Sequence, residues 1–251
     1  MGLPNISIVE AEAMHPELQE LADAEGKILA PSMSPGKGED PTEVLPEMAH
    51  RFVRAGAKVI KINYSCPNKI AGGGGREAVL GNDLETMFEI DDKIVATVGE
   101  DIIIVRKLPP YVSDKKILIP EVAKRFSNVR GKVVLALSNT IGGQYILTEL
   151  GDPALNVPGN LGGLSGPATI EVGRDQLRRF RELLPHHVGI ISCLGVTNGQ
   201  EVYRRVDEMG ADLAEGVTVF IENETHRSMT YGQTAQELAE EYAKLLTQSE
   251  N

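Results

Sequence analysis

Apolar runs rich in β-branched residues alternate along the chain with stretches in which apolar residues recur every three or four positions. The runs are typical of strands covered on both faces, and the stretches are typical of amphipathic helices. The expected strands are Lys27–Met33, Lys58–Tyr64, Ile102–Lys107, Val133–Leu137, Val188–Cys193 and Asp212–Val217. The expected helices are Pro16–Ala24, Thr42–Ala55, Asp83–Val98, Lys116–Phe126, Ile170–Leu184, Gly199–Met209 and Ala235–Thr247. About six strand–helix units therefore predict an α/β fold with parallel strands.

The connections between these elements are of two kinds. Helices lead into the next strand through short links, in which a glycine is typical of the helix end. Strands lead into the next helix through longer segments rich in Gly, Asn, Ser and Pro, such as the loop expected over residues 138–168. In a TIM (β/α)8-type barrel the active site is built from the loops that follow the strands. Because no linker or break in composition is present, we expect a single barrel domain over residues 1–251 with its functional residues in those loops.

Composition and charge narrow the class of protein. The chain has 25 Lys and Arg against 36 Asp and Glu, a net charge of −11. This acidity argues against nucleic acids and anionic membranes, which require a basic face, so neither is an expected partner. It has no run of about 18 apolar residues that could span a membrane, and its N-terminus does not resemble a signal peptide. Two cysteines are too few for a disulfide framework and the histidines lack zinc spacing, so we expect a cytoplasmic protein without a metal site.

Polar side chains follow the second expected strand. Asn63 and Ser65 share one side of the extended chain, and a turn at Pro67 would bring Asn68 back towards them. Two carboxamides beside the Cys66 thiol could bind a planar ligand with ring amides while the thiol moves a proton. The same residues also fit a buried cysteine followed by an ordinary turn, which composition alone favours.

Lys107 ends the third expected strand, and two prolines stop the chain from extending further. Three interpretations remain open for this lysine. It could form a Schiff base, it could be a fixed cation beside an anionic cofactor ring, or its head group could reach solvent at the strand end.

Glycines mark the loops in the second half of the chain. Residues 162–168 place them directly before a helix, where free backbone amides can bind an anion. Glycine turns at 193–199 and 215–218 follow the last two expected strands, which is the usual phosphate site of these barrels. Each segment alone is also compatible with an ordinary turn.

Four motifs together resemble the dihydroorotate dehydrogenase family: Asn-Tyr-Ser-Cys-Pro-Asn at 63–68, Lys-Leu-Pro-Pro at 107–110, Ser-Asn-Thr at 138–140 and Gly-Gly-Leu-Ser-Gly-Pro-Ala at 162–168. Their order and spacing extend the resemblance over nearly the whole chain. The resemblance implies a flavoenzyme that oxidises (S)-dihydroorotate to orotate in pyrimidine biosynthesis, with FMN accepting the hydride. It leaves the electron acceptor open, with fumarate as one candidate, and includes a homodimer among the expected forms.

The resemblance also implies roles for individual residues. Cys66 matches the active-site base of the class 1 enzymes. The positions that match contacts to orotate are Met1, Gly2, Leu3, Asn63, Asn68, Asn139 and Thr140. The positions that match contacts to FMN are Asn63, Lys107, Gly166, Gly195, Gly216 and Val217.

Three features depart from the family pattern. Leu194-Gly195 stands where two glycines are usual, and Gly216-Val217 replaces a pair that usually ends in threonine. Residues 1–5 resemble a substrate loop that normally follows two strands and a helix, so we expect a barrel that is incomplete at its N-terminal side. The alternatives are a catalytically impaired flavin- or phosphate-binding barrel, an FMN barrel acting on another reduced pyrimidine, and an aldolase that uses Lys107.

Overall fold

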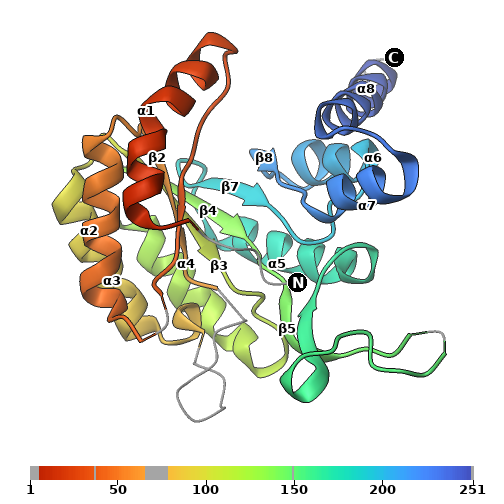
Figure 1. Cartoon of the computed structure of the whole chain (residues 1–251), viewed down its shortest axis with the longest axis horizontal. Coiled ribbons are helices and arrows are strands. Elements are labelled where there is room, and N and C mark those ends of the chain that lie inside the picture. The colour runs from red at the N-terminus through yellow and green to blue at the C-terminus, as the bar shows by residue number, and fades with distance from the viewer. Residues whose placement is uncertain (1–5, 37, 66–78, 149, 250–251) are drawn as a thin grey trace. The chain divides into compact units, whose positions relative to one another are not determined.

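The computed structural model describes residues 6–36, 38–65, 79–148 and 150–249 (Figure 1). The chain forms two compact units, one made of Met1–Leu108 and Asn128–Leu135 and the other of Pro109–Ser127 and Ala136–Asn251. Strand β4 (Lys132–Leu137) passes from the first unit into the second.

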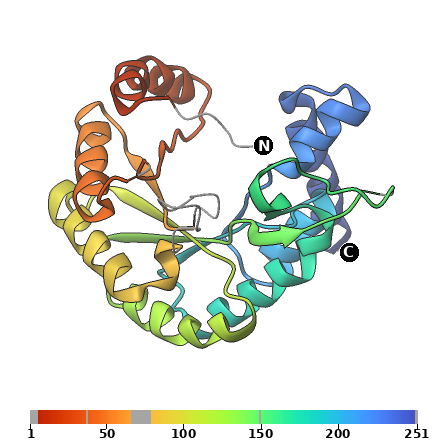
Figure 2. The same ribbon diagram turned by 60° about the horizontal axis from the view of Figure 1, so that its bottom comes forward.

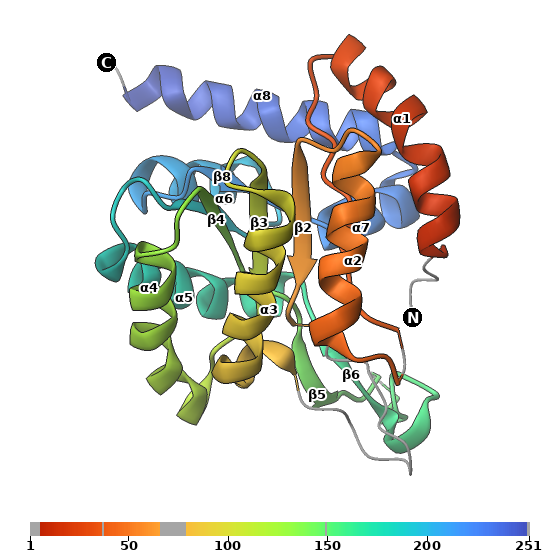
Figure 3. The same cartoon turned by 90° about the vertical axis from the view of Figure 1, so that its left-hand side faces the viewer.

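The first unit is a sheet covered by helices. Its strands follow the order β1 (Ser32–Met33), β2 (Val59–Asn63), β3 (Ile103–Leu108) and β4. Pairing is parallel from β1 to β2 and from β2 to β3. The helices are α1 (Ile8–Ala24), α2 (Pro41–Arg54) and α3 (Leu84–Val98), with a short 3-10 turn at Leu80–Asn82. Helices α2 and α3, orange and yellow, lie side by side outside β2 and β3 (Figures 2 and 3).

Helix α2 illustrates why these segments fold as predicted. The Asp40 carboxylate accepts the backbone N–H of Thr42 at 2.9 Å, which satisfies one of the free amides at the helix start. The helix then buries Leu45, Ala49 and Phe52, which recur at four- and three-residue spacing. A capped start and one apolar face therefore define this helix locally.

The second unit contains the end of β4 and two further strands of the sheet, β7 (Gly189–Ser192) and β8 (Leu213–Ala214), which pair in parallel. Strands β5 (Ile141–Tyr145) and β6 (Leu161–Leu164) form an antiparallel hairpin (Figure 3). The helices are α4 (Ile119–Ser127), α5 (Ile170–Leu183), α6 (Gly199–Tyr203), α7 (Thr218–Arg227) and α8 (Tyr231–Ser249). Short 3-10 turns occupy Ser113–Leu118, Pro158–Asn160 and Pro167–Thr169, and a π-helical turn, Arg204–Glu208, continues α6.

All expected strands are present, but the first and last are shorter than the apolar runs. Strand β1 covers Ser32–Met33 instead of Lys27–Met33, because Pro31 has no N–H to donate to the ladder. The pairing of β8 with β7 ends when the Glu215 N–H donates to the Ser192 carbonyl at 2.9 Å, just before Gly216. Parallel strands alternating with helices confirm the expected α/β class.

The prediction of a loop over residues 138–168 is wrong, because this segment contains the β5–β6 hairpin. The strand sequences Ile-Gly-Gly-Gln-Tyr and Leu-Gly-Gly-Leu are half glycine or nearly so, which hides the alternation that marks a strand. Helix α7 was also not expected, since among its residues only Val219 is buried and no amphipathic pattern results.

Two helix starts lie earlier than expected. Helix α1 begins at Ile8 instead of Pro16, because Ser7 and Glu10 form a reciprocal capping box that starts the helix about two turns before the proline. Helix α8 begins at Tyr231 because Thr230 and Gln233 cap each other in the same way, at 2.8 and 3.3 Å. Among the helices that the structure describes, none has both the length and the apolar character needed to cross a bilayer.

Candidate functional site

The ends of β2 and β3 carry the first group of expected site residues. Asn63 lies in register with Lys107 in the parallel pairing, and the Tyr64 backbone N–H donates to the Lys107 carbonyl at 3.1 Å. Residues paired in this way lie about 5 Å apart and point to the same face of the sheet. The first unit therefore presents a carboxamide and an ammonium side by side where two strands end.

A buried ion pair shows on which face of the sheet the Lys107 side chain lies. Arg106 is 1% exposed, and its guanidinium binds the Asp91 carboxylate of α3 through Nε at 2.7 Å and Nη2 at 3.1 Å. Because successive side chains of a strand alternate between faces, Lys107 lies on the face opposite α3 and is half-buried there. This placement favours a cation that serves a ligand on the inner face over a lysine that reaches solvent between the outer helices.

The Asn63 carboxamide is held by the turn that follows β2. Its Oδ1 accepts the backbone N–H of Ser65 at 3.1 Å and the Ser65 hydroxyl at 3.0 Å. Ser65 is itself buried. With the oxygen engaged in this turn, the NH2 is the group of Asn63 that is suited to donate to a ligand.

The end of β4 leads into the second group of expected residues. Ser138 is buried, and its Oγ has no hydrogen-bond partner among the residues that the structure describes. Asn139 and Thr140 are half-buried, and the Thr140 N–H donates to the Asn139 Oδ1 at 2.8 Å. A Cβ on Gly163 of β6 would lie 2.6 Å from the Thr140 Oγ1, so the hairpin packs directly against these polar residues. Buried hydroxyls are normally paired, so the Ser138 Oγ is suited to a polar ligand or a water.

Two expected glycines converge on the first turn of α5. Gly195 has a φ of +87°, and a Cβ there would lie 2.7 Å from the Cα of Ile170, the first residue of α5. Gly166 has a φ of +78°, and a Cβ there would lie 3.0 Å from the Thr218 Cγ2. Positive φ and lack of space both require glycine at these positions. Thr169 donates its hydroxyl to the Gly166 carbonyl at 2.8 Å and makes no side-chain cap to the amides of α5.

The turn after β8 completes this arrangement. A Cβ on Gly216 would lie 3.4 Å from the Val196 carbonyl oxygen, next to the Gly195 turn. Gly166, Gly195 and Gly216 thus bring the loops after β6, β7 and β8 together, and we call these three residues the glycine cradle. Backbone amides in such a cradle at a helix start are suited to bind a phosphate.

Val217 and Thr218 follow Gly216 at this turn. The Val217 side chain is 54% exposed, and only its backbone could contact a bound phosphate. Thr218, the first residue of α7, instead carries its side chain against Gly166. The threonine that usually ends this pair is therefore found one residue later in this chain, with its methyl group next to Gly166.

Five expected site residues, Met1, Gly2, Leu3, Cys66 and Asn68, lie outside the described residues. Of the others, Asn63 and Lys107 belong to the first unit, while Asn139, Thr140, Val217 and the glycine cradle belong to the second. Within the described part of the chain, no cluster of three or more His, Cys, Asp or Glu side chains could hold a metal ion.

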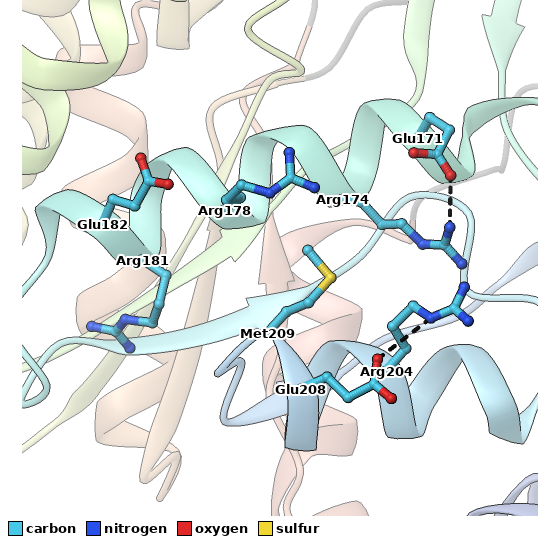
Figure 4. Close-up of a pocket in the computed structure, with 8 residues that line it drawn as sticks. All are labelled: Glu171, Arg174, Arg178, Arg181, Glu182, Arg204, Glu208 and Met209. Carbon is cyan, nitrogen blue, oxygen red and sulfur yellow. Dashed lines mark hydrogen bonds and ion pairs between the residues drawn. The ribbon is translucent and has the colours of Figure 1, made fainter.

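A groove of about 530 Å³ lies elsewhere in the second unit, between α5 and the π-helical turn (Figure 4). Four arginines, three glutamates and Met209 line it. Its arginines already have acidic partners, such as Glu171 for Arg174 at 2.6 Å and Glu208 for Arg204 at 3.6 Å. Because no expected site residue lines the groove and its charges nearly balance, it is not a candidate for the active site.

Parallel strands whose end loops carry a glycine cradle at a helix start are typical of phosphate-binding TIM-type barrels. The sequence matches the dihydroorotate dehydrogenase family over residues 1–239, and the chain belongs to this family. It is 33% identical over 165 residues to the catalytic subunit of dihydroorotate dehydrogenase B (NAD+) of Methanopyrus kandleri. It is 28% identical over 162 residues to the putative dihydroorotate dehydrogenase A (fumarate) of Aquifex aeolicus.

These two alignments cover 62% and 64% of this chain, and 48% and 49% of the relatives. The chain therefore spans about half the length of the curated relatives it matches. The crystal structure of the Eimeria tenella enzyme DHODH in complex with ferulenol is similar over 97% of this chain and 65% of that chain, with a TM-score of 0.71 and 17% identity. This likeness confirms the expected α/β fold of the TIM-barrel type.

Proposed function

We propose that the chain binds FMN and takes part in the oxidation of (S)-dihydroorotate to orotate, a step of pyrimidine biosynthesis. The observation that carries the proposal is the glycine cradle at the start of α5, because it offers backbone amides and excludes side chains where a phosphate would bind. Family membership gives the reaction class.

The residues of the cradle fit the phosphate of FMN. The N–H groups of Gly195 and of the first turn of α5 would donate to phosphate oxygens, and the Thr218 hydroxyl would add a further donor. The collision that a Cβ would make at Gly195, and the positive φ with a tight contact at Gly166, explain why these positions need glycine.

Asn63 and Lys107 are suited to the flavin ring. FMN supplies the hydride acceptor of the reaction when it is bound. The Lys107 ammonium would stabilise negative charge on the ring, and the Asn63 NH2 would donate to a ring or substrate oxygen. Both groups are held at strand ends, which fixes their positions more firmly than a loop would.

For the substrate we propose a set of amides, hydroxyls and loop groups: Met1, Gly2, Leu3, Asn63, Asn68, Asn139 and Thr140. The cyclic amides of dihydroorotate match the donors and acceptors of carboxamide side chains. We propose Cys66 as the base that removes the proton from C5. The relatives are named for NAD+, fumarate and quinone, so the acceptor is open, with fumarate as one candidate. We further propose a cytoplasmic setting from the chain's two cysteines.

A retention experiment tests this proposal. The full chain is mixed with FMN, separated from free ligand, and examined by visible absorption, which should show bound flavin. Anaerobic addition of dihydroorotate should then bleach the flavin, while dihydrouracil should not. Bleaching by dihydrouracil alone would favour a different reduced pyrimidine, and retained flavin that neither compound bleaches would indicate a binding barrel without this activity.

A further inference from the structure

Arg205 is a buried arginine that no part of the proposed reaction uses. Its side chain is fully buried in the π-helical turn that follows α6. Its Nε donates to the Glu201 carboxylate at 2.6 Å, and its Nη1 donates to the Ser192 hydroxyl at 3.0 Å and to the Cys193 carbonyl at 2.5 Å. A buried guanidinium is costly without such partners, so its position is well determined.

The groups that Arg205 binds belong to the walls of the glycine cradle. Ser192 ends β7, and Cys193 directly precedes the Leu194–Gly195 turn. On the other side, Nη2 donates to the carbonyl of Ile170 at 3.4 Å. The guanidinium therefore links the segment that leads into Gly195 to the first residue of α5, the two segments whose amides would hold the phosphate.

A glycine at the end of the first turn of α5 makes room for this link. A Cβ on Gly173 would collide with the Leu194 carbonyl oxygen and would lie 2.8 Å from the Arg205 Nη1. Glycine weakens a helix interior relative to alanine, so its presence here has a packing reason. The same close approach brings the Leu194 backbone, Arg205 and α5 together.

Arg205 shares its carboxylate partner with a second arginine. Glu201 is buried and accepts from both Arg205 and Arg174, the latter through Nε at 3.1 Å. Two guanidinium groups thus share the Glu201 carboxylate, and Arg174 also pairs with Glu171 at 2.6 Å, so the charges of the cluster balance and its contribution is to fix the position of Arg205.

We propose that Arg205 is the positioning residue for the phosphate-binding cradle, setting the Leu194–Gly195 turn against the start of α5. The inference rests on the proposed binding of FMN, and it concerns the recognition of the phosphate alone. Riboflavin has the same ring without the phosphate, so the ratio of its Kd to that of FMN isolates the contribution of the cradle.

The test measures both Kd values by flavin fluorescence for the full chain and three variants. The Arg205→Lys variant keeps the positive charge but loses the several N–H donors of the guanidinium. We expect the ratio of the riboflavin Kd to the FMN Kd to fall about tenfold or more, as for the loss of a charge-assisted hydrogen bond. Gly173→Ala keeps Arg205 but displaces the Leu194 carbonyl, and it should lower the ratio in the same direction. Gly173→Ala also tests the inference if the Arg205→Lys variant does not fold.

Arg106→Lys is the matched control, because Arg106 is an equally buried arginine paired with a carboxylate in the first unit. It should lower the melting temperature and leave the ratio unchanged. A wild-type ratio in both second-unit variants, with only a lower melting temperature, would overturn the inference. A ratio near one for the unmodified chain would show that the cradle does not bind the phosphate, and failure to bind either flavin would overturn the proposed function itself.

Discussion

Asn63 and Lys107 lie opposite each other in the parallel register where β2 and β3 end, and Tyr64, the residue that follows β2, donates its N–H to the Lys107 carbonyl. Arg106 points the other way, into a buried ion pair with Asp91 of α3. Because successive side chains of a strand alternate between faces, the lysine lies on the inner face. The pairing brings the Asn63 carboxamide and the Lys107 ammonium, which belong to two separate sequence motifs, next to each other as hydrogen-bond donors.

Lys107→Ala should weaken FMN binding by about 10- to 100-fold, because a charge-assisted contact to the flavin ring would be lost. Flavin fluorescence titration measures this change. Lys132→Ala is the control, since Lys132 is an exposed lysine at the start of the neighbouring β4. An affinity for FMN that is equal in the two variants would remove Lys107 from the binding site.

Gly195→Ala should lower the free energy of unfolding by about 3 kcal/mol or more and abolish tight FMN binding. The new methyl group would meet the backbone of Ile170 at a positive φ, so the strain of the left-handed region adds to a collision. Gly56→Ala has the same kind of φ, +102°, but open space around it, and should cost only about 1 kcal/mol. Urea denaturation compares the two, and equal losses would show that the contact with α5 is unimportant.

Glu201→Gln should change the response of the protein to acid. Burial by itself raises the pKa of the Glu201 carboxyl, but hydrogen bonds from Arg174 and Arg205 outweigh burial and hold the pKa below its ordinary value of 4.5. A depressed pKa contributes stability above pH 4.5 that is lost as the pH falls through the folded-state value. The variant should lose about 3–5 kcal/mol at neutral pH, because Arg205 is left without its carboxylate.

The difference in unfolding free energy between the wild type and Glu201→Gln should therefore shrink below pH 4.5. Urea denaturation at neutral and acid pH measures it. Glu237→Gln, which removes an exposed ion pair with Arg227, is the control and should have little effect at either pH. A constant difference for Glu201→Gln across the range would contradict the assigned role of the carboxylate.

Cys66→Ser should leave FMN bound and slow flavin reduction by dihydroorotate about 10²- to 10⁴-fold, the usual contribution of a general base. Serine is similar in size but is a far weaker base near neutral pH than a cysteine thiolate. Anaerobic stopped-flow absorption measures the rate, and the flavin content of the variant is the internal control. Reduction at the wild-type rate would exclude Cys66 as the base.

Long periodic segments were predictable from the sequence because their signals are local. Helix α2 begins one residue before the expected Thr42 and ends one residue before the expected Ala55, since an aspartate cap and a regular apolar face define it. The expected positions of Asn63 and Lys107 at strand ends are likewise confirmed, because strand termini follow the apolar runs.

Other features depend on contacts between distant residues and have no local signal. The β5–β6 hairpin is rich in glycine, so its pairing is visible only in three dimensions. Arg205 follows another arginine and resembles a surface residue in the sequence, yet it is buried by partners on β7 and α5. Thr218 shows the same limit, because its proximity to Gly166 comes from two loops that are about fifty residues apart in sequence.

The most direct test of the proposed function is a count of products. The FMN-loaded full chain is titrated anaerobically with dihydroorotate while bound flavin and orotate are both quantified. We expect one orotate to appear for each flavin that is bleached, because a two-electron oxidation of the substrate reduces one flavin. Fully loaded protein that keeps its flavin colour and forms no orotate would contradict the assignment of this activity to the chain.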